Sequence, residues 1–100
     1  MQDRDLFSGF IKLHILHHAA HEDIFGTGMI EELGNHGYKL SPGTIYPILH
    51  KMEVNGYLVS EKREVNGKIR KYYRSTADGR RALSLAKEKA RELFGELLAP

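Results

Sequence analysis

The 100-residue chain contains no cysteine and no tryptophan, and its net charge is only +2. The absence of cysteine excludes a disulfide scaffold and every thiolate metal site, and it fits a reducing compartment. No apolar run approaches the roughly 20 residues of a membrane span, and the first residues are charged where a signal peptide would be apolar. We therefore expect a small cytoplasmic domain that does not enter a membrane.

Two segments of the N-terminal half repeat apolar residues at helical spacing. The first, about residues 5–20, has so few polar interruptions that it predicts a largely buried helix. The second is short, with Thr27 as its expected N-cap residue and a glycine-rich stop at residues 34–37.

A third helix is expected to begin at Ser41 and Pro42. The serine hydroxyl can cap free backbone N–H groups, and proline at the first helical position costs no hydrogen bond. Gly56 ends the helix, because glycine adopts the left-handed conformation that closes one. Its apolar residues share one stripe and are Ile45, Ile48, Leu49 and Met52. The opposite face must therefore meet something other than the core.

Two strands, residues 57–65 and 68–75, follow without a linker. Asn66 and Gly67 join them, and this dipeptide suits a type I′ hairpin turn. Between residues 62 and 74 six basic side chains accompany a single acid. The neighbouring tyrosines at 72 and 73 must point to opposite faces, and the pattern does not decide which one enters the core.

A strict two-residue loop places like charges opposite each other in this hairpin. Arg63 would face Arg70, and Lys62 would face Lys71, which destabilises an isolated hairpin. A polyanion would compensate the repulsion, and arginine binds phosphate in bidentate fashion. The alternative is a solvated, charged edge hairpin that discourages aggregation. We favour phosphate binding.

The outward face of the third helix is unusual for a solvated surface, because it holds a large tyrosine and a proline that strains the preceding turn. A kinked surface helix is the alternative. A helix that ends against a DNA groove would instead offer its N-terminus to phosphate and its polar side chains to sugar or bases. The predicted DNA contacts are Ser41, Pro42, Thr44, Tyr46, Pro47, His50 and Lys51 on the helix and Lys62, Arg63, Lys68, Arg70 and Lys71 on the hairpin.

A last helix is expected from Thr76 to about Leu98, a length of ~33 Å that would extend beyond a small core. Its apolar residues alternate at spacings of three and four. The first of them can pack on the first helix of the same chain, whereas those near the C-terminus need a second chain as cover. The predicted dimerisation residues are Phe7, Phe10, Leu83, Ala86, Ala90, Leu93, Phe94 and Leu97.

Together these elements predict a mainly α fold with a small β-hairpin wing, a winged helix-turn-helix over residues 1–76 followed by a C-terminal dimerisation helix over residues 77–100. The residues also resemble the PadR family of transcriptional regulators. The resemblance is carried by LSPGTIYPILHKMEVNGYL from Leu40, by GKIRKYYRST from Gly67, and by T-x-x-G at Thr76 and Gly79. It implies a homodimeric cytoplasmic repressor, with the first and last helices at the dimer interface, that binds a pseudo-palindromic double-stranded operator. Members that stack planar ligands do so on a tryptophan, which this chain lacks.

Four histidines of the first helix, His14, His17, His18 and His21, recur at i, i+3, i+4 and i+7. This spacing suits a divalent metal such as zinc, nickel or cadmium, with Glu22 and Asp23 as further ligands. The chain would then be a metal-responsive regulator or a metal-binding protein. Packing at a dimer interface and a pH response near pH 6 are the alternatives. The effector, small molecule or metal, stays open.

Two other function classes are alternatives to a DNA-binding regulator. An enzyme is not expected, because the chain has no glycine-rich phosphate loop and no H-E-x-x-H motif. A pure protein-interaction module is the other alternative, since winged helices are also used in that way. Duplex DNA is favoured over RNA, because a helix fits the B-form major groove and not the narrow A-form groove.

Overall fold

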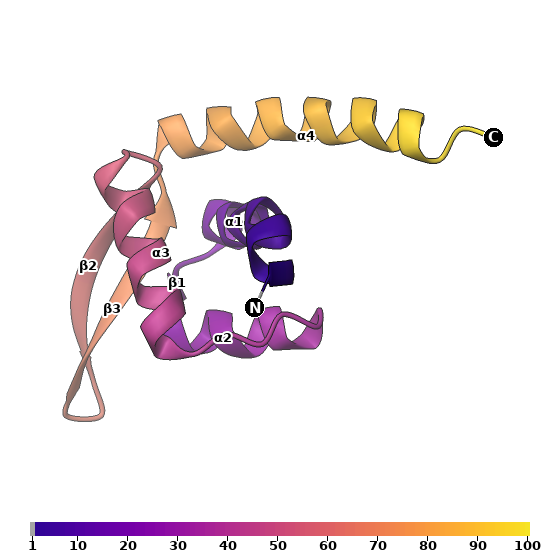
Figure 1. The fold of residues 1–100 in the computed structure, drawn as a ribbon. Helices are drawn as coiled ribbons and strands as arrows, with labels where there is room; N and C mark the ends of the chain where they lie inside the picture. The colour runs from indigo at the N-terminus through magenta and orange to yellow at the C-terminus, as the bar shows by residue number, and fades with distance from the viewer. Residues whose placement is uncertain (1) are drawn as a thin grey trace.

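The computed structural model describes residues 2–100, and within that range it has four helices and one three-stranded antiparallel sheet (Figure 1). This confirms the predicted mainly α fold with a hairpin wing. The elements are α1 (Gln2–His21), β1 (Ile24–Phe25), α2 (Gly26–Asn35), α3 (Pro42–Val54), β2 (Leu58–Val65), β3 (Lys68–Ser75) and α4 (Ala77–Leu97).

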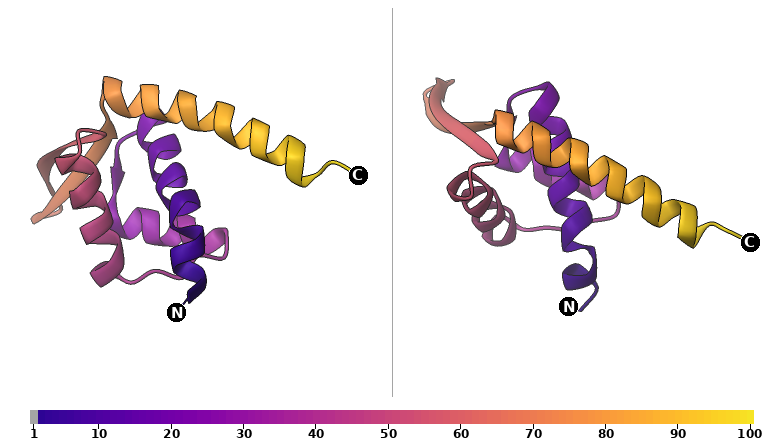
Figure 2. Two further views of the ribbon diagram at one scale, coloured as in Figure 1. Left: turned by 45° about the horizontal axis from the view of Figure 1, so that its top comes forward. Right: turned by 90° about the horizontal axis from the view of Figure 1, so that it is seen from above.

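Helix α1 occupies the centre of the fold, with α4 crossing it on one side and α2 lying on the other (Figures 1 and 2). Its apolar residues one turn apart, Ile11 and Ile15, are almost completely buried. The core continues into α2, α3 and β2, and its fully buried side chains are Ile11, Ile15, Leu33, Ile45, Leu49 and Leu58.

The sheet has the strand order β1-β3-β2. In the wing, which is the hairpin of β2 and β3, Arg63 pairs with Arg70 across the strands as predicted. Asn66 and Gly67 have φ angles of 54° and 80°, as a type I′ turn requires. Strand β1 has only two residues, and so short a segment shows no periodicity from which a strand can be predicted.

Strand β1 also corrects the predicted start of α2. Phe25 pairs with β3 and is held in an extended conformation, so it becomes the N-cap residue and the helix begins at Gly26 rather than after Thr27. At α3 the prediction of Ser41 as N-cap is right in position. Among the described residues, however, its hydroxyl is 3.4 Å from Thr44 Oγ1 and bonds to none of the free backbone N–H groups.

Thr76 joins the wing to α4 as predicted. Its Oγ1 accepts a hydrogen bond from the Gly79 amide at 3.0 Å and donates one to the Gly56 carbonyl at 2.6 Å. The inner half of α4 packs on α1 through the buried Leu83. The outer half extends beyond the core, which makes the molecule 56 Å long but only 20 Å thick.

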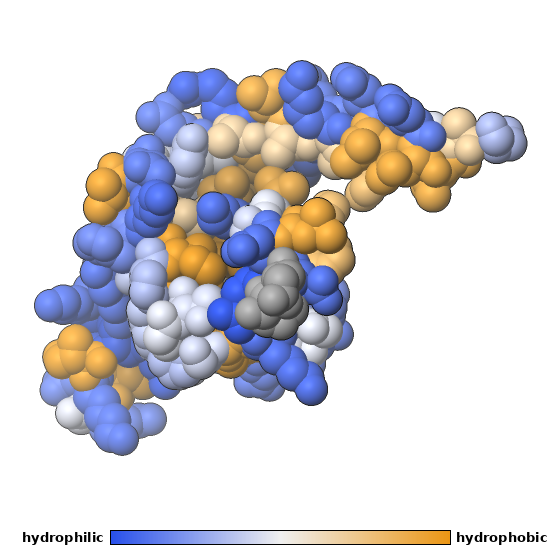
Figure 3. Space-filling model, viewed as in Figure 1, coloured by the Kyte–Doolittle hydropathy of each residue, from blue (hydrophilic) through white to orange (hydrophobic). Residues whose placement is uncertain are grey.

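Apolar residues gather on the lower side of this outer half in the view of Figure 3. Leu97 is 65% exposed there, and Leu93 and Phe94 are each 46% exposed. None of the helices in residues 2–100 has the length and apolar character that a membrane crossing requires.

Candidate nucleic-acid interface

Helix α3 presents the two faces that its sequence predicts. Ile45 and Leu49 are completely buried and Met52 is nearly so, whereas Ile48 is half-buried. On the opposite face Thr44 is half-buried, and the other predicted contacts are exposed: Ser41, Pro42, Tyr46, Pro47, His50 and Lys51. This face is therefore accessible over the length of the helix.

The side chain of Tyr46 contacts α2. Its ring lies against the backbone of Gly26, the first residue of α2, so that a Cβ there would be 2.5 Å from Tyr46 Cζ and 2.7 Å from its hydroxyl oxygen. Between this contact and the wing lies a groove of about 570 Å³. Its basic wall comes from β3, through Lys68, Arg70 and Lys71.

Several basic side chains of the wing have partners inside the molecule. Arg63 forms ion pairs with Glu61 and, at 2.5 Å, with Asp23, and both hydrogen-bonded carboxylates raise the pKa of its guanidinium. Arg63 also lies 4.4 Å above the ring centre of Tyr72. The guanidinium of Arg70 lies 4.2 Å above the ring of Phe25. The predicted Arg63–Arg70 repulsion is therefore compensated within the chain.

The two tyrosines of β3 separate as alternation requires. Tyr73 is 3% exposed and belongs to the core, and Tyr72 faces the other side of the sheet against Phe25. Tyr72 thus supports the basic side of the wing, which the sequence alone left undecided.

Glu53 connects α3 to the wing. Ser60 donates a hydrogen bond of 2.6 Å to Glu53 Oε2, and Lys71 Nζ lies 3.6 Å from Oε1. The Ser60 hydrogen bond is the main reason why the pKa of Glu53 lies below its usual value. Through this contact the orientation of the wing is tied to that of α3. Lys62 and Lys68, by contrast, are exposed.

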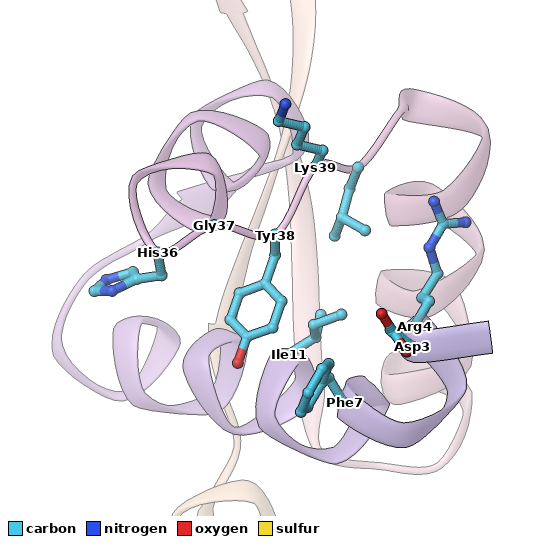
Figure 4. A pocket seen from close by; sticks show the side chains of 9 residues that line it. Asp3, Arg4, Phe7, Ile11, His36, Gly37, Tyr38 and Lys39 are labelled. Atoms are coloured by element: carbon cyan, nitrogen blue, oxygen red, sulfur yellow. The ribbon is translucent and has the colours of Figure 1, made fainter. Parts of the chain in front are cut away.

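A hydrogen bond also connects α1 to α3. Arg4 Nη1 donates to Thr44 Oγ1 at 3.3 Å. Arg4 lines a hollow of about 400 Å³ between α1 and the segment after α2, where Phe7 and Tyr38 meet edge to face (Figure 4). No pattern in the sequence predicts this hollow, because its two walls are about 30 residues apart in the chain.

The histidines of α1 do not all face the same partners. The rings of His17 and His21 lie with their centres 4.8 Å apart and tilted to each other, and His21 Nδ1 lies 2.7 Å from the His17 carbonyl oxygen. His14 instead stacks on His36, which follows α2, at 4.5 Å. Burial, and then the neighbouring His36, lower the pKa of His14.

His18 contacts both His17, with ring centres 5.1 Å apart and the rings edge to face, and α2. Its Nε2 lies 3.7 Å from Glu32, whose other oxygen is 3.2 Å from His36 Nε2. Within residues 2–100 no three histidine, aspartate or glutamate side chains are arranged to hold a metal ion. The structure therefore does not support the metal interpretation. Helical spacing placed the rings on one face, but packing against α2 turned them toward different partners.

The predicted dimerisation residues lie on α1 and α4 and differ in exposure. Leu83 is covered by α1, and Ala86 and Ala90 are half-buried. The others are exposed: Phe7, Phe10, Leu93, Phe94 and Leu97. Phe10, Leu93 and Phe94 line an apolar hollow of about 410 Å³ between α1 and α4.

Comparison with known proteins gives a consistent result. Residues 15–85 match the model of the transcriptional regulator PadR-like family. Transcriptional regulator Rv3488 of Mycobacterium tuberculosis is 46% identical over 95 residues, which cover 95% of this chain and 89% of that protein.

Solved structures agree in fold. A PadR family transcriptional regulator from Eggerthella lenta is 31% identical, with a TM-score of 0.81 over 94% of this chain and 86% of that one. A PadR-like transcriptional regulator from Bacillus cereus is 26% identical, with a TM-score of 0.80 over 96% of this chain and 98% of that one.

Proposed function

The chain belongs to the PadR-like family of transcriptional regulators, and on that premise we propose that it is a sequence-specific, homodimeric repressor of transcription. The observation that carries the proposal is the exposed face of α3 beside the basic wing. A helix of this width fits the major groove of B-form DNA, where base edges can be read. Like its relatives, the chain is a regulator and not an enzyme.

The two parts of this surface have different roles in the proposal. Tyr46, His50 and Lys51 project from α3 and supply contacts to bases and sugars. The exposed lysines of the wing, Lys62 and Lys68, supply phosphate contacts that carry affinity but little sequence information.

The homodimer is supported by the apolar outer half of α4. Leu93, Phe94 and Leu97 extend beyond the core, and a second copy would cover them together with Phe10. A twofold dimer presents two copies of α3, which fits half-sites of a pseudo-palindromic operator about one helical turn, or ~34 Å, apart.

An effector that controls DNA binding is also part of the proposal. Arg4 lines the hollow beside Phe7 and Tyr38 and donates a hydrogen bond to Thr44 of α3. The hollow is therefore connected to α3 through this bond. A small molecule seated there would contact Arg4 and could alter the position of α3.

The test of DNA binding starts with selection of bound sequences from a random duplex pool, with and without a panel of small molecules. The affinity for the selected duplex is then measured against salt concentration. We expect a steep decrease, with a slope of roughly −0.9 for each phosphate neutralised. Lys51→Ala should weaken binding, and Arg91→Ala, which removes one charge from the outer part of α4, should not. Absence of any enriched duplex would refute the proposal.

A further inference from the structure

Gly26 makes an unusually close contact. It is buried at the start of α2, where a Cβ would overlap Tyr46 Cε1 and lie 2.5 Å from Cζ. Its φ lies outside the left-handed region occupied by Gly37, Gly56 and Gly67. Glycine is therefore needed here for space and not for conformational freedom.

The contact fixes the outer end of the tyrosine ring. The three atoms nearest to the position of a Gly26 Cβ are Cε1, Cζ and the hydroxyl oxygen, so the polar end of the ring is the part held against α2. Tyr46 is nevertheless 43% exposed. A side chain that is held and exposed at once is preorganised for a partner from outside.

The exposed side of the ring borders the basic groove. Tyr46 forms one wall of this groove, and Lys68, Arg70 and Lys71 of β3 form the other. The ring of Phe25 packs against the guanidinium of Arg70, and Phe25 immediately precedes Gly26 in the chain. The position of the tyrosine ring therefore sets the width of the groove.

We propose that Gly26 is a positioning residue for DNA binding, which allows the Tyr46 ring to lie against α2 so that its hydroxyl and the exposed Lys68 of β3 face the same stretch of the duplex sugar–phosphate backbone. Gly26 itself touches no DNA in this scheme. The inference rests on the proposed function, since it assigns a role within the same surface. A side chain at position 26 would require the ring to leave its place against α2, and the groove is the space beside it.

A double-mutant cycle tests this inference on the full chain with the selected duplex. Gly26→Ala should weaken binding about tenfold, as the loss of one charge-assisted hydrogen bond would. The salt slope should stay close to that of the wild type, because the tyrosine hydroxyl carries no charge and releases no counterion. In the background of Tyr46→Ala, the Gly26→Ala substitution should change affinity less than about twofold, because no ring remains to be displaced.

Gly34→Ala is the matched control, since a Cβ at this other glycine of α2 points into open space. It should bind as the wild type does. Wild-type affinity of a folded Gly26→Ala variant, or losses that multiply in the double variant, would overturn the inference while leaving the proposed function intact. Failure of the wild type to bind any duplex would instead overturn the proposed function.

A third variant keeps the test decisive if Gly26→Ala does not fold. Tyr46→Phe retains the ring and removes the hydroxyl, and we expect it to lose affinity several-fold with an unchanged melting temperature. Wild-type binding by both Tyr46→Phe and Tyr46→Ala would show that the ring position is irrelevant and would overturn the inference.

Discussion

The guanidinium of Arg63 lies 2.5 Å from the carboxylate of Asp23, 40 residues earlier in the chain, and this ion pair fastens the wing to the segment before β1. Glu61 pairs with the same guanidinium. The positive charge of Arg63 is thus balanced before any partner arrives. The opposition of Arg63 and Arg70 alone is consequently no argument for a polyanion, and the case for DNA rests on the exposed lysines and on α3.

Lysine and arginine of the wing should therefore differ in their contribution to DNA binding. Lys68→Ala removes an exposed charge and should reduce the salt slope by about one phosphate contact. Arg63→Ala should change the slope much less, because Asp23 and Glu61 already neutralise its charge. Fluorescence anisotropy at several salt concentrations measures both slopes. A larger change for Arg63→Ala would mean that the guanidinium leaves its carboxylates for DNA.

The glycine of the T-x-x-G motif, Gly79, is required by close packing, and the free energy of unfolding tests this. A Cβ at Gly79 would overlap the Tyr57 carbonyl oxygen and lie 2.5 Å from Ser75 Oγ. Gly79→Ala should lower the free energy of unfolding by about 1–3 kcal/mol, as overpacking against backbone does. Gly95→Ala, whose Cβ faces open space, should stabilise α4 by up to about 1 kcal/mol. Urea denaturation measures both, and equal effects would contradict this explanation.

The proposed dimer predicts a specific sensitivity at the end of α4. Leu97→Glu places a charge in the apolar seam, which is the exposed row of Leu93, Phe94 and Leu97 on α4. It should convert the protein to monomers at micromolar concentration, because an unpaired buried charge is costly. Ser84→Glu adds the same charge to an exposed position outside the seam and should leave the dimer intact. Sedimentation velocity distinguishes these states. A monomeric wild type would exclude the dimer.

The stability of the fold should decrease on mild acidification. Burial, His36, His18 and His17 lower the pKa of His14, and Glu32 opposes them. Because the unfolded chain then binds more protons, stability is highest above about pH 6.5 and is lost as the pH falls below that value. His14→Gln should show a smaller decrease in melting temperature between pH 7.5 and pH 5.5. Parallel profiles for the two proteins would exclude His14 as the group responsible.

Much of the architecture could be predicted from the sequence because it depends on local signals. The apolar stripe of α3, the type I′ turn at Asn66 and Gly67 and the N-cap at Thr76 each involve residues close together in the chain. The candidate surface on α3 follows from the same stripe, since the face opposite the buried residues is the exposed one.

Contacts between distant segments could not be predicted in this way. The ion pair of Arg63 with Asp23, the two-residue strand β1 and the contact of His14 with His36 all depend on which elements meet. Helical spacing fixes the face on which a side chain lies but not the partner opposite that face.

By itself, the sequence determined the order of the elements, the buried stripe of each helix and the concentration of positive charge in the wing, because these follow from periodicity and turn chemistry. Only the tertiary structure decided which of those charges are already paired, and that Tyr46 is held on Gly26 beside the basic groove. The reason is physical: ion pairs and close packing depend on distances between groups that are far apart in the chain, and only folding sets those distances.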